Sequence, residues 1–110
     1  MRGVAVNIAL ISFRDENTEL LISKVNKVAK DHQFNLVINN LNPTDKDKIN
    51  ENTHLILLVP KVRYEYLSFK KLANLLKIKV MVIDTIDFSA LDGYAVFVKI
   101  LQTIRDSLTK

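Results

Sequence analysis

Two segments of the sequence hold side chains whose types and spacing could support chemistry. In residues 12–19 the hydroxyl of Ser12 is followed by three acids, and residues 84–92 hold three aspartates. A serine hydroxyl is barely ionised near neutral pH unless a base assists it, and no histidine base for Ser12 is evident in the sequence. Taken alone, Ser12 is therefore a poor nucleophile.

The three aspartates of the second segment are Asp84, Asp87 and Asp92. Carboxylates gathered in one loop are ligands that a divalent cation prefers. The same residues also suit a turn at the end of a strand and the N-cap of a following helix, where aspartate accepts from free backbone amides. We favour the turn and the cap over a metal cluster.

Other reactive groups are scarce. The chain has no cysteine, which excludes disulfides, thiolate nucleophiles and cysteine-based zinc or iron–sulfur sites. Its two histidines, His32 and His54, have no second ligand type beside them at metal spacing, so we interpret both as structural or surface residues. We therefore expect no metal and no cofactor.

The net charge of +4 and the isoelectric point near 9.4 raise the question of an anionic partner such as nucleic acid. Along most of the chain the lysines mix with acids, and no aromatic residues interleave with them as in single-strand binders. We interpret the charge as a solvated surface and expect no nucleic acid to bind. The exception is the stretch between Lys61 and Lys79, where Glu65 is the one acid among the basic residues Lys61, Arg63, Lys70, Lys71, Lys77 and Lys79.

Strands and helices must position these side chains, and the sequence indicates them by short apolar runs that alternate with segments of helical periodicity. The runs predict strands at residues 4–11, 34–39, 54–59 and 79–83. The periodic segments predict helices at 18–31, 64–76 and 93–108, a short helix at 45–50 and a loop at 84–92. This alternation predicts one α/β domain over residues 1–110, an open four-stranded parallel sheet with helices on both faces. The first strand should be internal, because Asn7 is its one polar residue.

Apolar positions predict which face of each helix meets the core. The first helix should be capped by Asn17 or Thr18. Its core face should comprise Leu21, Ile22, Val25, Val28 and Ala29. In the second helix the core residues should be Leu67, Leu72, Leu75 and Leu76, and in the last Phe97, Ile100, Leu101, Ile104 and Leu108.

Ligands of open parallel sheets bind at the carboxyl ends of the strands. The segments expected there are residues 12–18, 39–44, 60–64 and 84–92. No run approaches 18 apolar residues, so no membrane insertion is expected, and no small-residue cleavage site follows the apolar residues 1–12. We therefore expect a cytoplasmic location.

Three segments, in order and at matching spacing, resemble the lactose/cellobiose-type IIB components of the bacterial phosphoenolpyruvate-dependent sugar phosphotransferase system. They are the strand Asn7-Ile8-Ala9-Leu10-Ile11 before a helix with Leu20-Leu21, the segment Leu57-Leu58-Val59-Pro60-Lys61-Val62-Arg63-Tyr64, and Val82-Ile83-Asp84 followed by Asp87-Phe88 and Asp92-Gly93. The resemblance implies a flavodoxin-like three-layer sandwich. It also implies an activity in which a cysteine accepts a phosphoryl group from a histidine of a IIA protein and passes it to a sugar entering through the IIC membrane transporter.

The loop after the first strand departs from the family pattern. Counting back from Leu20 places Ser12 at the position of the family's phosphorylated cysteine. Phe13 and Arg14 replace small residues, and Asp15 stands where the family has glycine. If that position requires a positive φ, Asp15 adopts it only at some cost. Glu16, Asn17, Thr18 and Glu19 complete the loop, and of these Thr18 alone keeps the family's residue type.

The acids of this loop have two interpretations. Asp15, Glu16 and Glu19 lie where a phosphate dianion would bind and should repel it, by about 1 kcal/mol for a pair of like charges 4 Å apart in water. They are also ordinary acids for the first turn of a helix, where each stabilises the helix dipole by about 0.3–1 kcal/mol. Both interpretations are compatible with loss of phosphate binding.

The sequence thus predicts a degenerate IIB-like component, without the family's phosphotransferase activity, that docks on IIA-like or IIC-like proteins or on a regulator. The resemblance gives Pro60, Arg63, Tyr64 and Asp92 a partner-binding or loop-bracing role. One alternative is a working phosphoryl carrier in sugar uptake that uses Ser12 or another acceptor. A second alternative is an unrelated small ligand bound at the strand ends.

Overall fold

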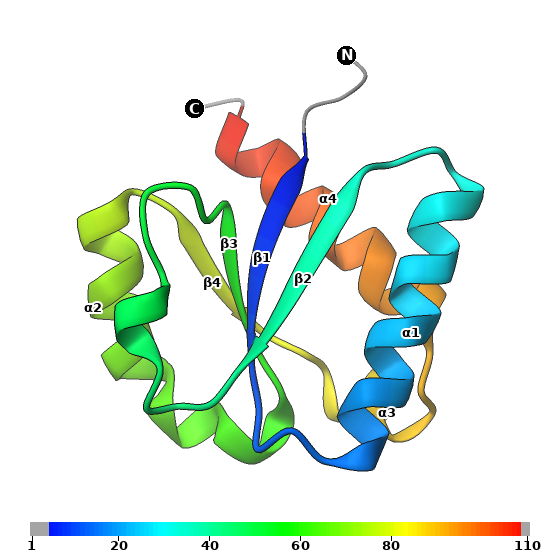
Figure 1. Ribbon diagram of the computed structural model, residues 1–110, viewed down its shortest axis with the longest axis horizontal. Coiled ribbons are helices and arrows are strands. Elements are labelled where there is room, and N and C mark those ends of the chain that lie inside the picture. The colour runs from blue at the N-terminus through cyan, green and yellow to red at the C-terminus, as the bar shows by residue number, and fades with distance from the viewer. Residues whose placement is uncertain (1–4, 109–110) are drawn as a thin grey trace.

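The sheet has four parallel strands in the order β2-β1-β3-β4. The computed structural model describes residues 5–108, and side chains as far as residue 105 (Figure 1). The strands are β1 (Val6–Ile11), β2 (Leu36–Leu41), β3 (Leu55–Leu58) and β4 (Lys79–Val82). The α/β class, the parallel sheet and the internal position of the first strand are confirmed. Residue 4, with which the first strand was expected to begin, lies outside the described residues.

Strand β1 is internal because it is apolar on both faces. Ile8 to Ile11 are all buried and pair with β2 on one side and β3 on the other. Neighbours on both edges satisfy its amides and carbonyls, and helices cover its two faces. Ser12, the residue that follows the strand, therefore lies near the centre of the carboxyl edge of the sheet.

Strand β2 begins two residues later than the sequence predicted. Residues 32–34 form the turn that ends the preceding helix: Gln33 has a φ of 56°, and the amide of Phe34 donates to the carbonyl of Ala29 at 2.8 Å. The ring of Phe34 packs edge-on against Phe97, with centroids 5.8 Å apart, instead of joining the sheet. At its other end the strand extends to Leu41, whose carbonyl accepts from the amide of Ser12 at 2.9 Å.

The helices cover both faces of the sheet (Figure 1). They are α1 (Glu16–Asp31), η1 (Lys46–Lys48), η2 (Pro60–Glu65), α2 (Tyr66–Leu76), α3 (Thr85–Ser89) and α4 (Gly93–Leu108). Helices α1 and α4 pack against each other on one face, and α2 lies against β3 and β4 on the other. Helix η1 is shorter than the helix expected at 45–50, and α3 occupies the middle of the expected loop at 84–92.

The start of α4 lies directly against α1. A Cβ atom at Gly93 would be 2.8 Å from both the carbonyl carbon and the Cβ of Lys24, a separation that non-bonded carbons do not adopt. The absence of a side chain at Gly93 therefore lets the two helices approach closely.

The expected core faces of α1 and α4 are confirmed, but that of α2 is partly wrong. In α1, Leu21, Val25 and Ala29 are buried, and in α4, Phe97 and Ile100 are buried, with the other expected residues partly buried. The side chain of Leu108 lies outside the described residues.

Helix α2 instead buries Phe69 and Ala73, while Leu67 and Leu75 are 74% and 79% exposed. The expected Leu72 and Leu76 are partly buried against the core. Helix α2 begins at Tyr66, and Tyr66, Phe69, Ala73 and Leu76 recur along it at intervals of three and four residues. They form the face that meets the core, and Leu67 and Leu75 lie outside that face.

Candidate functional site

Ser12 stands at the end of β1 and its hydroxyl is engaged on both sides. The side chain is fully buried, with 0% exposure. Its Oγ donates to Oδ1 of Asn40 at 2.7 Å and accepts from the backbone amide of Arg14 at 2.8 Å. Asn40 in turn donates through Nδ2 to Oε2 of Glu19 at 2.9 Å. The hydroxyl therefore ties the β1–α1 loop to the end of β2.

The strained residue of this loop is Arg14, not Asp15. Arg14 has a φ of 61°, in the left-handed region that non-glycine residues rarely adopt, whereas Asp15 has an extended conformation at φ −83° and ψ 174°. The family has glycine at the position of Asp15, which raised the question of a positive φ there. The structure shows that Asp15 has no positive φ. The hydrogen bond from the Arg14 amide to Ser12 helps to hold this conformation.

Asp15 is the N-cap of α1. Its Oδ1 accepts from the amide of Thr18 at 2.9 Å and from the hydroxyl of Thr18 at 2.8 Å, and Oδ2 lies 3.8 Å from Nζ of Lys61. The expected caps, Asn17 or Thr18, are wrong, because the helix begins two residues earlier, at Glu16. Glu16 and Glu19 then lie in the first turn, as the helix-dipole interpretation requires.

The pKa of the Asp15 carboxyl is lowered from its usual range, mainly by the Thr18 amide, then by the Thr18 hydroxyl and by Lys61. A carboxylate with a lowered folded-state pKa stabilises the fold above its unfolded-state pKa, near 3.9. That stabilisation is lost as the pH falls through the lower folded-state pKa.

We expect Asp15→Asn to keep the cap at neutral pH and to remove this acid-dependent part of the stability, because asparagine caps as well as aspartate but carries no charge. Asp15→Ala should lose about 0.5–2 kcal/mol at pH 7, since the Thr18 amide loses its acceptor. Urea unfolding between pH 2 and 7 measures both effects. Equal slopes of stability against pH below pH 4 in wild type and Asp15→Asn would contradict the role given to this carboxylate.

The neighbouring segment of the carboxyl edge is η2, which forms one side of an open groove. The groove has a volume of about 550 Å³. Its lining comprises Pro60, Lys61, Arg63 and Tyr64 from η2, with Thr85, Phe88 and Ser89 from the region of α3. Tyr64 is 69% exposed, and Phe13 of the β1–α1 loop is 53% exposed. The carboxyl edge therefore presents two exposed aromatic rings, and Lys61 and Arg63 lie beside Tyr64.

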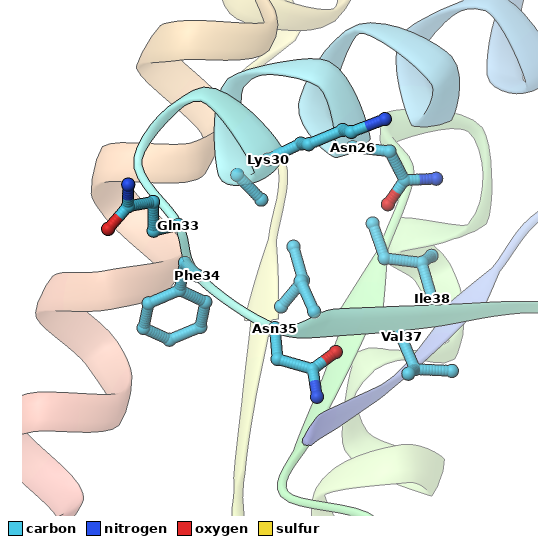
Figure 2. Close-up of a pocket in the computed structure, with 9 residues that line it drawn as sticks. Asn26, Lys30, Gln33, Phe34, Asn35, Val37 and Ile38 are labelled. Carbon is cyan, nitrogen blue, oxygen red and sulfur yellow. The ribbon is translucent and has the colours of Figure 1, made fainter. Parts of the chain in front are cut away.

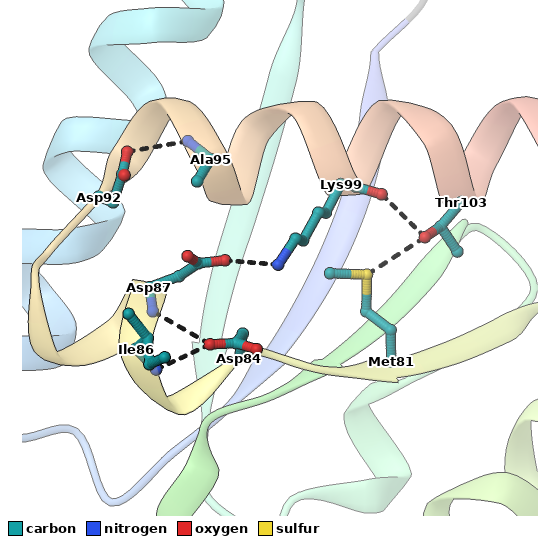
Figure 3. Close-up of polar contacts among 8 residues, drawn as sticks. All are labelled: Met81, Asp84, Ile86, Asp87, Asp92, Ala95, Lys99 and Thr103. Atoms are coloured by element: carbon teal, nitrogen blue, oxygen red, sulfur yellow. Dashed lines mark hydrogen bonds and ion pairs between the residues drawn. The ribbon is translucent and has the colours of Figure 1, made fainter.

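The three aspartates of residues 84–92 act as caps and as an ion-pair partner (Figure 3). Asp84 accepts from the amide of Ile86 at 2.8 Å at the start of α3, and Asp92 accepts from the amide of Ala95 at 3.0 Å at the start of α4. Asp87 lies 2.7 Å from Nζ of Lys99 and raises the pKa of that amine. The turn and the cap are confirmed.

Among the side chains that the structure describes, no three histidines or acids gather in a way that could hold a metal ion. Asp92 is not among the residues that line the groove, and its side chain caps the start of α4. The histidines have structural contacts: His32 stacks on Phe97 with centroids 5.7 Å apart, and Nδ1 of His54 accepts from the amide of Asn7 at 2.9 Å.

Neither the contact of Asn40 with Ser12 nor the pairing of Lys61 with Asp15 was predicted from the sequence. The sequence predicted that the second strand ends at residue 39, but Asn40 belongs to β2 and lies 28 residues from Ser12, its hydrogen-bond partner. The sequence did contain one indication that these residues could meet, because a parallel sheet places the carboxyl ends of β1, β2 and β3 at one edge. The individual contacts were not available, because they depend on the register of the strands.

The order of the strands and the two layers of helices define an open, parallel α/β sandwich with its candidate site at the carboxyl edge. Within residues 5–108, no helix has the length and apolar character needed to cross a membrane. No family model matches the sequence, and no curated protein matches it.

Two solved structures are similar to the chain. One is the lactose-specific IIB component domain of the phosphoenolpyruvate:carbohydrate phosphotransferase system from Streptococcus pneumoniae, with a TM-score of 0.79, 18% identity, and coverage of 91% of this chain and 98% of that one. The other is the cellobiose-specific phosphotransferase IIB component from Borrelia burgdorferi, with a TM-score of 0.70, 23% identity, and coverage of 94% and 92%. The chain has the fold of these IIB components over nearly its whole length.

Proposed function

We propose that the protein is a cytoplasmic IIB-like component of a sugar phosphotransferase system that no longer relays phosphate and acts by docking on a IIA-like, IIC-like or regulatory partner. The proposal rests on the fold shared with lactose- and cellobiose-specific IIB components. It rests equally on the contents of the β1–α1 loop, which in a phosphoryl carrier must supply a nucleophile and a binding site for an anion.

The observation that carries the proposal is the Asp15 cap. Phosphate groups bind at helix N-termini because free amides and the helix dipole favour negative charge. In this chain the carboxylate of Asp15 accepts from the Thr18 amide, so an anion of the protein itself takes a donor that a phosphoryl group would need. Glu16 and Glu19 add negative charge in the same turn. These contacts support the loss of phosphate binding.

The contacts of Ser12 oppose its use as a substitute acceptor. Its proton is directed at the amide oxygen of Asn40, which is not a base, and the side chain is fully buried. A hydroxyl nucleophile needs an adjacent general base to be activated. Phosphoserine would also be a stable ester that is unsuited to onward transfer.

The exposed side chains of the carboxyl edge support docking. Phe13, Tyr64 and Ile86 are exposed there, and Lys61 and Arg63 lie beside Tyr64. Aromatic and arginine side chains are enriched at the centres of protein interfaces. A partner that meets this edge would bury apolar side chains next to Lys61 and Arg63.

We expect no covalent phosphate on this protein after incubation with phosphoenolpyruvate, the general phosphotransferase proteins and a matching IIA protein. Intact mass spectrometry measures the result, with a cysteine-containing IIB component in the same mixture as the positive control. A stoichiometric gain of one phosphoryl group that disappears in Ser12→Ala would contradict the proposal and favour a working carrier.

Docking is tested separately by titrating the protein with lactose- and cellobiose-type IIA proteins and IIC transporters. Tyr64→Ala should weaken binding by about tenfold or more, as expected for an exposed aromatic anchor. Leu75→Ala is the matched control, because Leu75 is also an exposed apolar residue but lies near the far end of α2. Equal affinities of the two variants would argue against the carboxyl edge as the docking surface.

A further inference from the structure

The outer edge of β2 is an unpaired strand edge without charge. Strand β2 is the last in the sheet and pairs with β1 alone among the described strands. Its sequence, Leu-Val-Ile-Asn-Asn-Leu, contains no charged residue and no proline. Natural proteins usually protect such edges with charges, prolines or bulges, because an exposed edge is a template for pairing with another strand. The opposite edge strand, β4, is shorter and begins with Lys79.

The backbone groups that face outward from β2 follow from its pairing with β1. The carbonyls of Asn35 and Leu41 accept from the amides of Val6 and Ser12, so the odd-numbered residues of this segment face β1. Because hydrogen-bonding direction alternates along a strand, the amides and carbonyls of Leu36, Ile38 and Asn40 face away from the sheet.

A hollow lies beside this edge on the face that α1 covers (Figure 2). It is lined by Asn26, Ala29 and Lys30 of α1 and by Phe34, Leu36 and Ile38 at the start of β2. In Figure 2 the side chain of Ile38 points toward Asn26, whereas Val37 points to the other face of the sheet. Leu36 and Ile38 are only partly buried, so α1 leaves apolar surface open next to the unpaired backbone.

We propose that β2 pairs antiparallel with β2 of a second copy of this chain, across a twofold axis at Ile38, and joins the two sheets into one. In this arrangement Ile38 faces Ile38 of the second copy, and Leu36 faces Asn40. The outward groups of these residues then form about six main-chain hydrogen bonds. Ile38 and Leu36 of each copy fill the open surface beside the hollow of the other. A twofold axis uses the same patch on both copies, which is the commonest symmetry of soluble oligomers.

Charge complementarity favours a second copy over an unrelated strand. Glu19 hydrogen-bonds Asn40 near the end of β2, and Lys30 lines the hollow beside Leu36 near its start. The eleven residue steps from Glu19 to Lys30 span about 16 Å of helix, and Leu36 to Asn40 span about 13 Å of strand. An antiparallel neighbour therefore brings Glu19 of each copy to the end of the strand where Lys30 of the other lies.

Sedimentation velocity over a range of concentrations tests the proposal, with twice the 12.6 kDa mass of the chain expected at high concentration. Ile38→Pro removes an outward amide that the monomer does not use, and proline is tolerated at such edge positions. Ile38→Ala is its matched control, since it shortens the same side chain and keeps the amide. We expect Ile38→Pro to weaken self-association at least about tenfold more than Ile38→Ala.

Two further measurements identify the interface and do not depend on the proline variant folding. Hydrogen exchange of the wild-type amides of Leu36, Ile38 and Asn40 should slow as concentration rises. Lys30→Glu should weaken self-association, and Glu19→Lys combined with Lys30→Glu should restore it. A monomer up to about 1 mM, at which association is weaker than about −4 kcal/mol, would overturn the proposal. A dimer in which these three amides gain no protection would also overturn it.

Discussion

Ser12→Cys alone is expected to leave the protein unable to accept phosphate from a phosphorylated IIA protein. The substitution supplies a sulfur atom but places it where the side chain of Ser12 is fully buried, and the loss of hydration on burial raises the pKa of a thiol. The negative charge of Asp15, three residues away, opposes the thiolate as well. The Asp15 carboxylate also continues to occupy the Thr18 amide, so the incoming phosphoryl group lacks a donor.

A regrafted loop should transfer phosphate at least about 100-fold faster than Ser12→Cys alone, the size of effect expected when a missing anion donor is restored. The graft combines Ser12→Cys with Phe13→Ser, Arg14→Gly, Asp15→Ser, Glu16→Ser and Glu19→Thr. Glycine belongs at position 14, where φ is 61°, and serine at 15 keeps an N-cap without a charge.

Thiol titration and phosphate transfer are measured for both of these variants. Circular dichroism of each variant controls for folding. Rapid transfer by Ser12→Cys alone, with a thiol pKa well below that of free cysteine, would show that the wild-type loop still binds phosphate. The proposed function would then be wrong as well.

Phe69→Ala is expected to destabilise the fold by about 3–5 kcal/mol, and Leu75→Ala by no more than about 0.5 kcal/mol. Phe69 of α2 is fully buried in the hydrophobic core, so its removal leaves a cavity. Leu75 is 79% exposed, so its removal returns almost no buried surface to water. Lys46 also lies over the Phe69 ring, with Nζ 5.0 Å from its centroid, and this contact is lost too.

Urea unfolding monitored by circular dichroism measures the two free energies. Comparing the two variants distinguishes the observed core face of α2 from the face that the leucine spacing predicted, because that prediction placed Leu75 in the core. A larger loss for Leu75→Ala than for Phe69→Ala would show that the helix buries the face expected from the sequence.

Much of the architecture could be predicted because it depends on local patterns. Apolar runs of strand length that alternate with amphipathic segments allow few arrangements other than a parallel sheet covered by helices. The faces of α1 and α4 followed from periodicity, since both helices are long enough for the apolar stripe to be unambiguous. The start of β2 did not follow, because the turn at residues 32–34 sets it. The core face of α2 did not follow from the leucines, because Phe69 and Ala73 are the buried residues of that helix.

The sequence by itself determined the fold class, the internal position of β1, the absence of a cysteine and the accumulation of acids in residues 12–19. The tertiary structure alone decided what those acids and Ser12 do. Asp15 became a cap because α1 begins at Glu16, and the Ser12 hydroxyl found Asn40 because the register of β1 against β2 brings them together. Such contacts join residues far apart in the chain, so their geometry depends on the packing of the whole sheet and not on any local pattern.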